Sequence, residues 1–305
     1  MNSEKISVSI GALQRTYGPE KALRIASEIG ANAVDFGLDL FSQTPRPYDV
    51  RNPESIYCKS DEEIITYFKK LKEYADSLGL KICQTHGRFK GFINDEAADA
   101  ILVENIRRDL LATSALGAPV CVVHTATTLH LGPQPPELMY KLNFDMFTTV
   151  IPFAKEYGVK IATETFGDAS TYGTCDFFGN IEHFTKGYED ICAVEDFKDY
   201  FTICMDTGHS NKAVLYGQPS SADVIRRLRE NITVLHLNDN NKLQDQHKIP
   251  MTGDLDWKDI MNALEEIGYD GYYNMELNLG WFGPDMLVET ASFAIKVMKN
   301  LLKER

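Results

Sequence analysis

The sequence of 305 residues lacks the features of a secreted or membrane-inserted protein. No stretch approaches the roughly 18 uninterrupted apolar residues that a membrane helix needs, and the N-terminal segment MNSEKISVSIGAL has no apolar core of signal-peptide length. The six cysteines form no CxxC pair, and three of them lie in apolar, strand-like runs, as reduced and buried thiols do. We therefore expect a cytoplasmic protein with free thiols and no membrane segment.

The sequence also has little positive charge. It carries 31 Lys and Arg residues against 44 Asp and Glu residues, which gives a formal net charge of −13. On average such a surface repels phosphate backbones and anionic membranes. The charge therefore argues against nucleic acid and membranes as partners and favours a small-molecule ligand.

No Pro-, Ser- or Gly-rich linker divides the chain, and no low-complexity segment interrupts it. Short β-rich runs alternate with longer amphipathic ones, the pattern that builds parallel sheets through right-handed crossovers. We count eight such runs, at 6–12, 33–38, 81–86, 120–125, 160–166, 201–207, 233–239 and 272–277. The first run lacks the GxGxxG loop of an open dinucleotide-binding sheet. The sequence therefore predicts an α/β fold, a single (β/α)8 TIM barrel over residues 1–305, with an elaborated loop and helix at 176–200.

Ionisable side chains gather at the carboxyl ends of the predicted strands, namely His86, His124, Glu164, Asp206, His236 and Glu276. In a barrel these ends form one mouth, where barrel enzymes keep their active sites. Three carboxylates among imidazoles repel one another and are poorly solvated unless a cation compensates. The sequence therefore predicts one divalent metal ion bound by Glu164, Asp206, His236 and Glu276. This oxygen-rich set favours Mn²⁺, Mg²⁺ or Co²⁺ and leaves Zn²⁺ open.

The segment VLHLNDNNKLQDQHKIP adds two further polar groups near the mouth. Asp245 and His247 are two residues apart, so in an extended segment both side chains point the same way. His209 lies three residues after Asp206, at the rim. Two interpretations stay open: these side chains bind the loop and substrate hydroxyls, or they hold a second cation.

The motifs IATETF, CMDTGHSN, VLHLNDNN, DQHKIPMTGDLDW and YYNMELN, in this order and at these strand positions, resemble the sugar phosphate isomerase/epimerase family of xylose isomerase-like TIM barrels. The resemblance covers essentially the whole chain. It implies that Glu164, Asp206, His236 and Glu276 hold one divalent ion and that Glu164 and Glu276 are the catalytic acid/base pair. It also implies that His209 orients a substrate hydroxyl. The expected reaction is isomerisation or epimerisation of a ketose, sugar phosphate or keto-polyol through a metal-stabilised enediolate.

Two other activities use similar ligands. The related endonuclease IV family binds three zinc ions to cleave abasic DNA, and this sequence has a residue for each of its nine ligands: His86, His124, Glu164, Asp206, His209, His236, Asp245, His247 and Glu276. It departs from that pattern at Gly208, where the nucleases have cysteine, and at Gln246, where they have arginine. The segment HKIPMTGDLDW instead resembles the sugar enzymes, apart from Met251 and Thr252. A dehydratase acting on keto-polyols or dehydroshikimate would use the same ligands as an epimerase.

The sequence gives less information about which substrate is bound. We expect His86, His124, His209, Asp245 and His247 to contact the substrate if they do not bind metal. Arg88 in THGRFKGF either binds a phosphate or carboxylate of the substrate or belongs to a surface basic cluster. Trp281, followed by Phe282, either stacks on a sugar ring or contacts another subunit. Exposed aromatics of this kind are compatible with a homo-oligomer.

Overall fold

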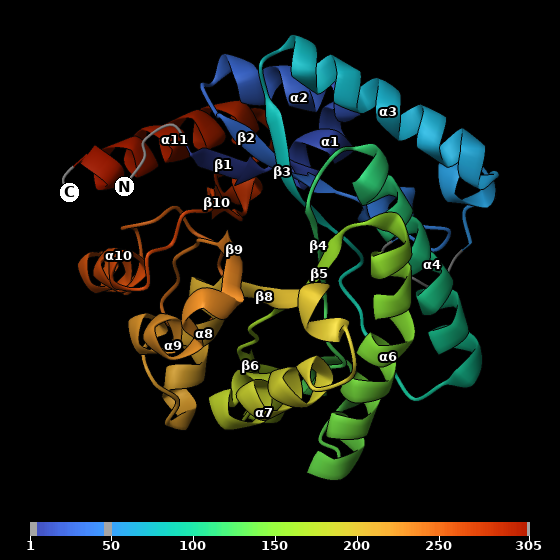
Figure 1. Ribbon diagram of the computed structural model, residues 1–305. Coiled ribbons are helices and arrows are strands. Elements are labelled where there is room, and N and C mark those ends of the chain that lie inside the picture. The colour runs from blue at the N-terminus through green and yellow to red at the C-terminus, as the bar shows by residue number, and fades with distance from the viewer. Residues whose placement is uncertain (1–4, 46–50, 304–305) are drawn as a thin grey trace.

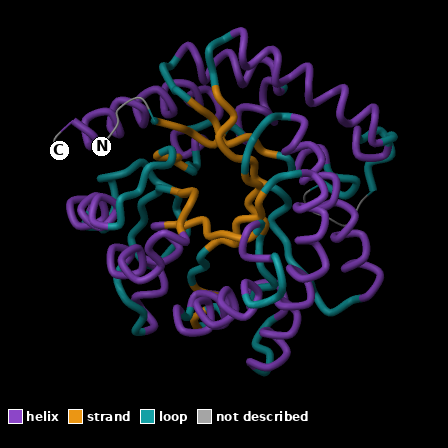
Figure 2. Tube along the Cα trace, in the orientation of Figure 1, coloured by secondary structure: helices purple, strands orange, loops and turns teal. Residues whose placement is uncertain are grey.

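Eight parallel strands form a nearly closed ring in the computed structural model, which describes residues 5–45 and 51–303 (Figures 1 and 2). The strands are β1 (Ile6–Ser9), β2 (Ala33–Gly37), β3 (Lys81–His86), β4 (Val120–Val123), β5 (Lys160–Glu164), β8 (Phe201–Asp206), β9 (Ile232–His236) and β10 (Tyr273–Met275). They pair in the order β10-β1-β2-β3-β4-β5-β8-β9, and a bridge between Leu237 and Met275 brings the two ends together. The predicted TIM barrel is therefore confirmed.

Helices surround the ring on its outer side (Figure 2). The α-helices are α1 (Gly11–Tyr17), α2 (Pro19–Glu28), α3 (Asp61–Ser77), α4 (Glu96–Ala115), α5 (Thr128–Leu131), α6 (Pro136–Tyr157), α7 (Ile181–Cys192), α8 (Thr207–Ala213), α9 (Ser221–Leu228), α10 (Trp257–Glu266) and α11 (Leu287–Lys303). Short 3-10 segments lie at 39–41, 56–58, 170–172, 177–179, 197–199, 214–216, 229–231, 279–282 and 284–286. Among the described residues, no helix is long and apolar enough to span a bilayer.

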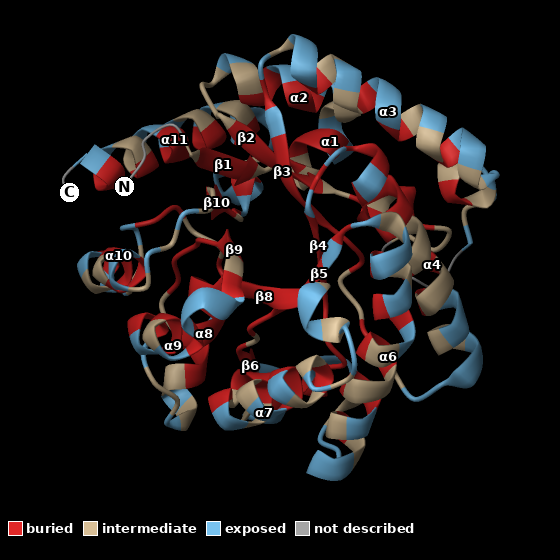
Figure 3. Ribbon diagram, in the orientation of Figure 1, coloured by how far each residue is buried: buried red, intermediate tan, exposed pale blue. Residues whose placement is uncertain are grey.

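Several helices, among them α3, α4, α7 and α10, begin where the sequence supplies a side-chain cap, and each of them buries one face. The Ser60 hydroxyl accepts a hydrogen bond from the backbone N–H of Glu63, and the Ser60 backbone N–H donates one to the Glu63 carboxylate, which together form the capping box that starts α3. Ile64, Phe68 and Leu71 then form its buried stripe. Figure 3 shows the same division around the ring, with strands buried and outer helix faces exposed. The core therefore lies between the ring and the helices.

Several predicted strands are shorter in the structure because the chain turns at the barrel mouth. The first strand ends at Ser9 and α1 begins at Gly11, within the run predicted as strand 6–12. His124 and Glu276 lie one residue beyond β4 and β10. The elaborated segment also begins earlier than 176, since β6 (Asp168–Ala169) pairs with β7 (Thr174–Cys175) in an antiparallel hairpin after β5. The region predicted at 176–200 contains α7 between the 3-10 segments 177–179 and 197–199, and the hairpin extends this elaboration toward β5.

Candidate functional site

Strand alternation places the polar residues of the mouth inside the barrel. Side chains two residues apart on a strand point to the same face. A small buried apolar cluster contains Val122, Ala162, Cys204 and Val234. The residues two positions further along these four segments are His124, Glu164, Asp206 and His236. The barrel interior therefore has an apolar layer below and a layer of imidazoles and carboxylates above it, at the mouth.

Four of these mouth residues form the group predicted as a metal site. Glu164, Asp206, His236 and Glu276 each offer a ligand atom within 4.8 Å of the others. His236 Nδ1 lies 2.6 Å from Glu164 Oε1 and 3.4 Å from Glu276 Oε2. Three carboxylates and one imidazole are the donor set of a divalent cation bound mainly through oxygen. The arrangement of these side chains therefore fits such an ion.

The pKa values in the cluster depend on two opposing effects: burial disfavours the charged form of a side chain, and a neighbouring opposite charge favours it. Burial alone raises the pKa of Glu164, but the neighbouring imidazoles of His236 and His124 outweigh it and hold the pKa at about 2. Burial dominates at Asp206 and raises its pKa to about 6. Burial lowers the pKa of His236, yet the surrounding anions outweigh it and raise that pKa well above the ordinary value. Ion pairs with the imidazoles therefore hold Glu164 charged inside the barrel, whereas burial favours the protonated form of Asp206.

Asp206 is fixed by groups on two neighbouring segments. Its Oδ1 accepts a 2.6 Å hydrogen bond from the backbone N–H of His209, which makes Asp206 the N-cap of α8. Its Oδ2 accepts from Asn238 Nδ2 at 2.8 Å. Gly208 packs directly against this amide: a Cβ there would lie 1.9 Å from Asn238 Oδ1. The cysteine that the nuclease pattern has at this position therefore cannot fit without displacing Asn238.

Two histidines form a second group beside the first. His86 Nε2 and His124 Nε2 are 2.8 Å apart, and His124 Nε2 is 3.2 Å from Glu164 Oε2. His86 Nδ1 points toward Glu276, whose Oε1 is 3.3 Å away. Burial lowers the pKa of His124 to about 3, so this ring is neutral and can accept a hydrogen bond or bind a cation. His86, His124 and Glu164 together have the spacing of a metal-binding group.

A third group, the rim triad, consists of His209, Asp245 and His247. His209 Nε2 lies 3.6 Å and His247 Nε2 lies 3.2 Å from Asp245 Oδ2. The other nitrogen of each ring donates to a backbone carbonyl, of Thr165 and Glu276 respectively, at 3.1 Å. Burial lowers the pKa of His247, but Asp245 and Glu276 outweigh it and raise the pKa to about 10. The three side chains can therefore stay close together in two ways: protonated imidazoles form ion pairs with Asp245, or a bound cation bridges the three side chains.

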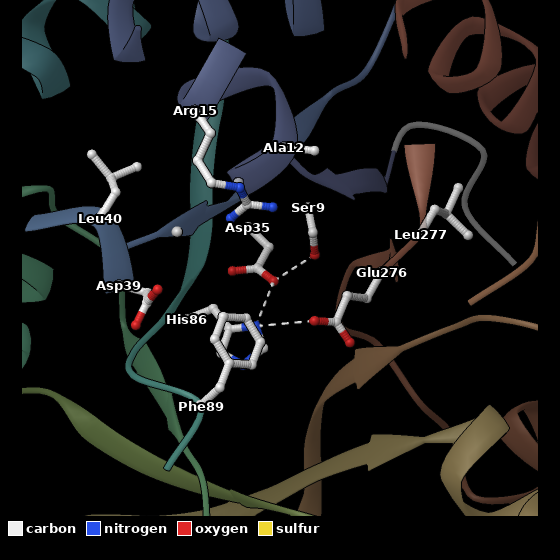
Figure 4. Close-up of a pocket in the computed structure, with 12 residues that line it drawn as sticks. Ser9, Ala12, Arg15, Asp35, Asp39, Leu40, His86, Phe89, Glu276 and Leu277 are labelled. Atoms are coloured by element: carbon white, nitrogen blue, oxygen red, sulfur yellow. Dashed lines mark hydrogen bonds and ion pairs between the residues drawn. The ribbon is translucent and has the colours of Figure 1, made fainter. Parts of the chain in front are cut away.

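Asp35 is a site residue that the sequence analysis missed. It lies on β2, fully buried, and its Oδ2 accepts a 2.6 Å hydrogen bond from Ser9. The same oxygen is 3.4 Å from His236 Nε2 and 3.9 Å from His86 Nδ1. Figure 4 shows Ser9, Asp35, His86 and Glu276 joined in one chain of contacts across the mouth. The aspartate followed by an apolar residue in AVDFGL was the available signal, since a charged residue inside a buried strand requires partners.

Arg88 and Trp281 lie to the sides of this cluster. Arg88 is buried, and its Nη1 donates to Thr44 Oγ1 at 3.0 Å. Trp281 lines a separate groove with Ile249, Phe282 and Phe293, and the ammonium of Lys248 stands 5.6 Å from its ring centre. This groove and the cavity at the mouth share the lining residue His247.

A cavity of about 350 Å³ opens over the cluster. Among its lining residues are Phe89, His124, Phe166, His209 and Glu276. The Phe89 ring lies 5.1 Å from that of His124, and the Phe166 ring lies 5.0 Å from that of His209. The volume is within the range of small-molecule sites. A ligand here would meet two aromatic rings at its sides and imidazoles and Glu276 at the cavity floor.

A closed parallel barrel with a carboxylate and imidazole cluster at its mouth defines a TIM-barrel protein with a candidate metal centre. Residues 23–297 match the family model of the xylose isomerase-like TIM barrel, and the chain belongs to this family.

Known relatives give the same picture of the fold. A D-tagatose 3-epimerase-like protein superposes with a TM-score of 0.73 at 21% identity, over 98% of this chain and 97% of its own. The 3-keto-D-glucoside 4-epimerase YcjR from E. coli superposes with a TM-score of 0.68 at 16% identity, over 96% of this chain and 99% of its own. The IOLI protein with a bound zinc atom superposes with a TM-score of 0.68 at 20% identity, over 98% of this chain and 97% of its own. At these identities the likeness establishes the fold.

Two sequence relatives have no assigned function. The chain is 27% identical to y4fM of Sinorhizobium fredii over 176 residues, 57% of this chain and 52% of that protein. It is 26% identical to MJ1311 of Methanocaldococcus jannaschii over 183 residues, 60% of this chain and 58% of that protein. The chain therefore spans little more than half the length of these curated relatives.

Proposed function

We propose that this protein is a divalent-metal-dependent isomerase or epimerase of a carbohydrate that carries a carbonyl group. The observation that carries the proposal is the placement of two glutamates, Glu164 and Glu276, in one four-residue group with the spacing of metal ligands, beside a cavity of ligand size. The epimerases among the structural neighbours support the reaction class, and the zinc atom in the IOLI protein supports metal binding in this fold.

Glu164, Asp206, His236 and Glu276 would hold the ion. When bound, the ion supplies Lewis-acid polarisation of the substrate carbonyl, which lowers the pKa of the adjacent C–H group. Glu276 lines the cavity, whereas Glu164 is buried beside two residues that line it, His124 and His209. In the proposed reaction one glutamate removes the proton next to the carbonyl, the C–H electron pair forms the enediolate, and the other glutamate returns a proton to carbon.

The imidazoles of the mouth would hold the substrate. His124 and His209 line the cavity between the aromatic rings of Phe89 and Phe166. His209 is fixed by its hydrogen bond to the carbonyl of Thr165, so its other nitrogen is oriented toward the rim and a substrate hydroxyl. A dehydratase would use the same groups and differ in expelling a hydroxyl group from the enediolate.

One observation favours a second candidate, a zinc phosphodiesterase resembling endonuclease IV. The nine residues named for that pattern fall into three metal-binding groups: His86 with His124 and Glu164; Glu164 with Asp206, His236 and Glu276; and the rim triad. Against it stand the packing of Gly208 on Asn238 and the net charge of −13, which opposes a DNA backbone.

Metal content and proton exchange test the proposal together. Elemental mass spectrometry of the purified protein should find one Mn, Mg or Co ion per chain. In D₂O the loaded protein should introduce deuterium next to the carbonyl of a sugar, and Glu164→Gln and Glu276→Gln should each remove this exchange while keeping the fold. Three zinc ions per chain with cleavage of abasic DNA would establish the second candidate instead. Exchange that persists in both glutamine variants would refute the acid/base assignment.

A further inference from the structure

The mouth cavity continues into a second cavity that the proposed reaction does not use. This outer cavity has a volume of about 260 Å³ and shares Leu129, Phe166, His209 and Asp245 with the first. Its own lining includes Asp168, Ser170, Lys212 and Gln244. The two cavities together form one cleft that runs from Glu276, past the rim triad, to the β6–β7 hairpin.

The charge of the outer cavity is already balanced within the protein. Lys212 Nζ lies 2.6 Å from Asp168 Oδ1, and both side chains are buried. Among the described residues that line the cleft, Lys212 is the only lysine or arginine. A phosphate there would approach the carboxylates of Asp168 and Asp245, and the cationic groups nearby, Lys212 and the imidazoles of the rim triad, are already paired with these carboxylates. Anions are therefore disfavoured at this end of the cleft.

The same groups suit a neutral ligand with several hydroxyls. A hydroxyl can donate to a carboxylate and accept from an ammonium, so the buried pair offers both kinds of partner. Ser170 and Gln244 are exposed at the edge and add further donors and acceptors. Phe166 and Leu129 supply the apolar surface on which the C–H face of a sugar ring packs.

Another small cavity offers no better place for a phosphate. It adjoins Phe89 and Glu276 on the other side of the mouth and contains Arg15 (Figure 4). It also contains the carboxylates of Asp35 and Asp39, and its volume is about 80 Å³. Typical ligand sites are several times larger than this small cavity. A substrate therefore extends from the mouth into the cleft toward Lys212.

From this cleft we infer that the substrate is an uncharged glycosylated sugar, with its carbonyl-bearing residue over Glu276 and a second sugar ring in the outer cavity. This inference rests on the proposed isomerase or epimerase activity and specifies its substrate class. The paired charges of the outer cavity disfavour a sugar phosphate, and a free monosaccharide leaves that cavity unfilled.

Three matched ketoses test the inference: D-fructose, D-fructose 6-phosphate, and isomaltulose, in which a glucosyl group occupies O6. Deuterium incorporation from D₂O, followed by mass spectrometry with the metal-loaded full chain, gives kcat/KM for each. We expect isomaltulose to exceed fructose by about tenfold, which one or two added hydrogen bonds provide, and the phosphate to fall below fructose. Equal rates for isomaltulose and fructose, or a preference for the phosphate, would overturn the inference alone. No exchange into any sugar would overturn the proposed function and the inference with it.

A bulky substitution in the outer cavity tests whether the second sugar ring binds there. Gln244→Trp fills the outer cavity from an exposed loop whose backbone stays anchored, since the Gln244 amide donates to Asn241 Oδ1. It should bring the isomaltulose-to-fructose ratio close to one. Lys198→Trp places the same bulk on an exposed residue just before β8, at the opposite end of the barrel, and should leave the ratio unchanged. An unchanged ratio in Gln244→Trp would show that the second ring does not occupy this cavity.

Discussion

Replacing Asp35 by asparagine should weaken metal binding although Asp35 is not among the proposed ligands. His236 presents Nδ1 to Glu164 and Glu276, at 2.6 and 3.4 Å, so Nδ1 is the nitrogen that would face the proposed ion. Its other nitrogen, Nε2, faces Asp35 Oδ2 at 3.4 Å and has no other hydrogen-bond partner in the part of the chain that the structure describes. A carboxylate in this position fixes the tautomer and orientation of a metal-binding histidine and increases its basicity.

The size of the effect follows from this geometry. Two full charges 3.4 Å apart attract by about 5 kcal/mol at an effective dielectric constant of about 20. A metal-bound imidazole carries only part of that positive charge at its N–H group, so the loss must be smaller. Loss of such carboxylate partners typically lowers metal affinity by about 10- to 100-fold, which corresponds to about 1.4–2.7 kcal/mol. We expect Asp35→Asn to fall in this range.

Chelator competition measures this affinity directly, with Co²⁺ as the probe because its visible absorption also reports ligand geometry. Asp39→Asn is the matched control, because it removes a buried carboxylate from the same small cavity. Melting curves of both metal-free variants would verify that they fold. Wild-type Co²⁺ affinity and an unchanged spectrum in folded Asp35→Asn would show that Asp35 does not orient His236.

Two substitutions, the addition of metal and a change of pH give further predictions for stability and metal binding. Gly208→Ala places a Cβ 1.9 Å from Asn238 Oδ1 and should lower the free energy of unfolding by about 1–3 kcal/mol, measured by urea denaturation. Trp257→Phe removes the 2.7 Å hydrogen bond from Nε1 to the buried Asp239 and should cost about 1–3 kcal/mol in the same assay. Adding Mn²⁺ to chelator-treated protein should raise Tm, with a stabilisation of about 2.7 kcal/mol at one hundred times Kd; an unchanged Tm would argue against a folded-state metal site. Lowering the pH from about 7.5 to about 5.5 should weaken Mn²⁺ binding, because the ligands must lose protons to bind.

The barrel could be predicted because its main signals are local. Alternation of β-rich and helical runs is visible without any knowledge of contacts, and strand ends share one edge of a parallel barrel. Residues such as Glu164, Asp206 and His236 could therefore be grouped before any distance was known. Whether they bind metal and move protons remains a prediction that the experiments above address.

Other parts of the site depend on packing between distant segments. Asp35 lies within a strand, and the sequence does not show that it faces His236 from across the barrel. Arg88 belongs to a segment whose basic and glycine residues suggest a surface loop, but the structure buries it against Thr44. Trp281 follows the last strand, yet the turn at 279–282 directs it to a separate groove. In each case the deciding contact joins residues far apart in the chain.

Charge balance links the number of metal ions to the protonation of the mouth. Five carboxylates gather there, of Asp35, Glu164, Asp206, Asp245 and Glu276, together with five imidazoles, of His86, His124, His209, His236 and His247. One divalent ion leaves a formal charge of −3 if every imidazole is neutral, whereas three ions leave +1. A single ion is therefore self-consistent only if protons remain on some imidazoles, and the rim triad is where they fit. Burial lowers the pKa of both its imidazoles, but Asp206 and Asp245 outweigh this effect at His209, and Asp245 and Glu276 outweigh it at His247. Under the proposed function the inner group takes the ion and the rim triad keeps its protons, so that His209 and His247 face a substrate as hydrogen-bond donors.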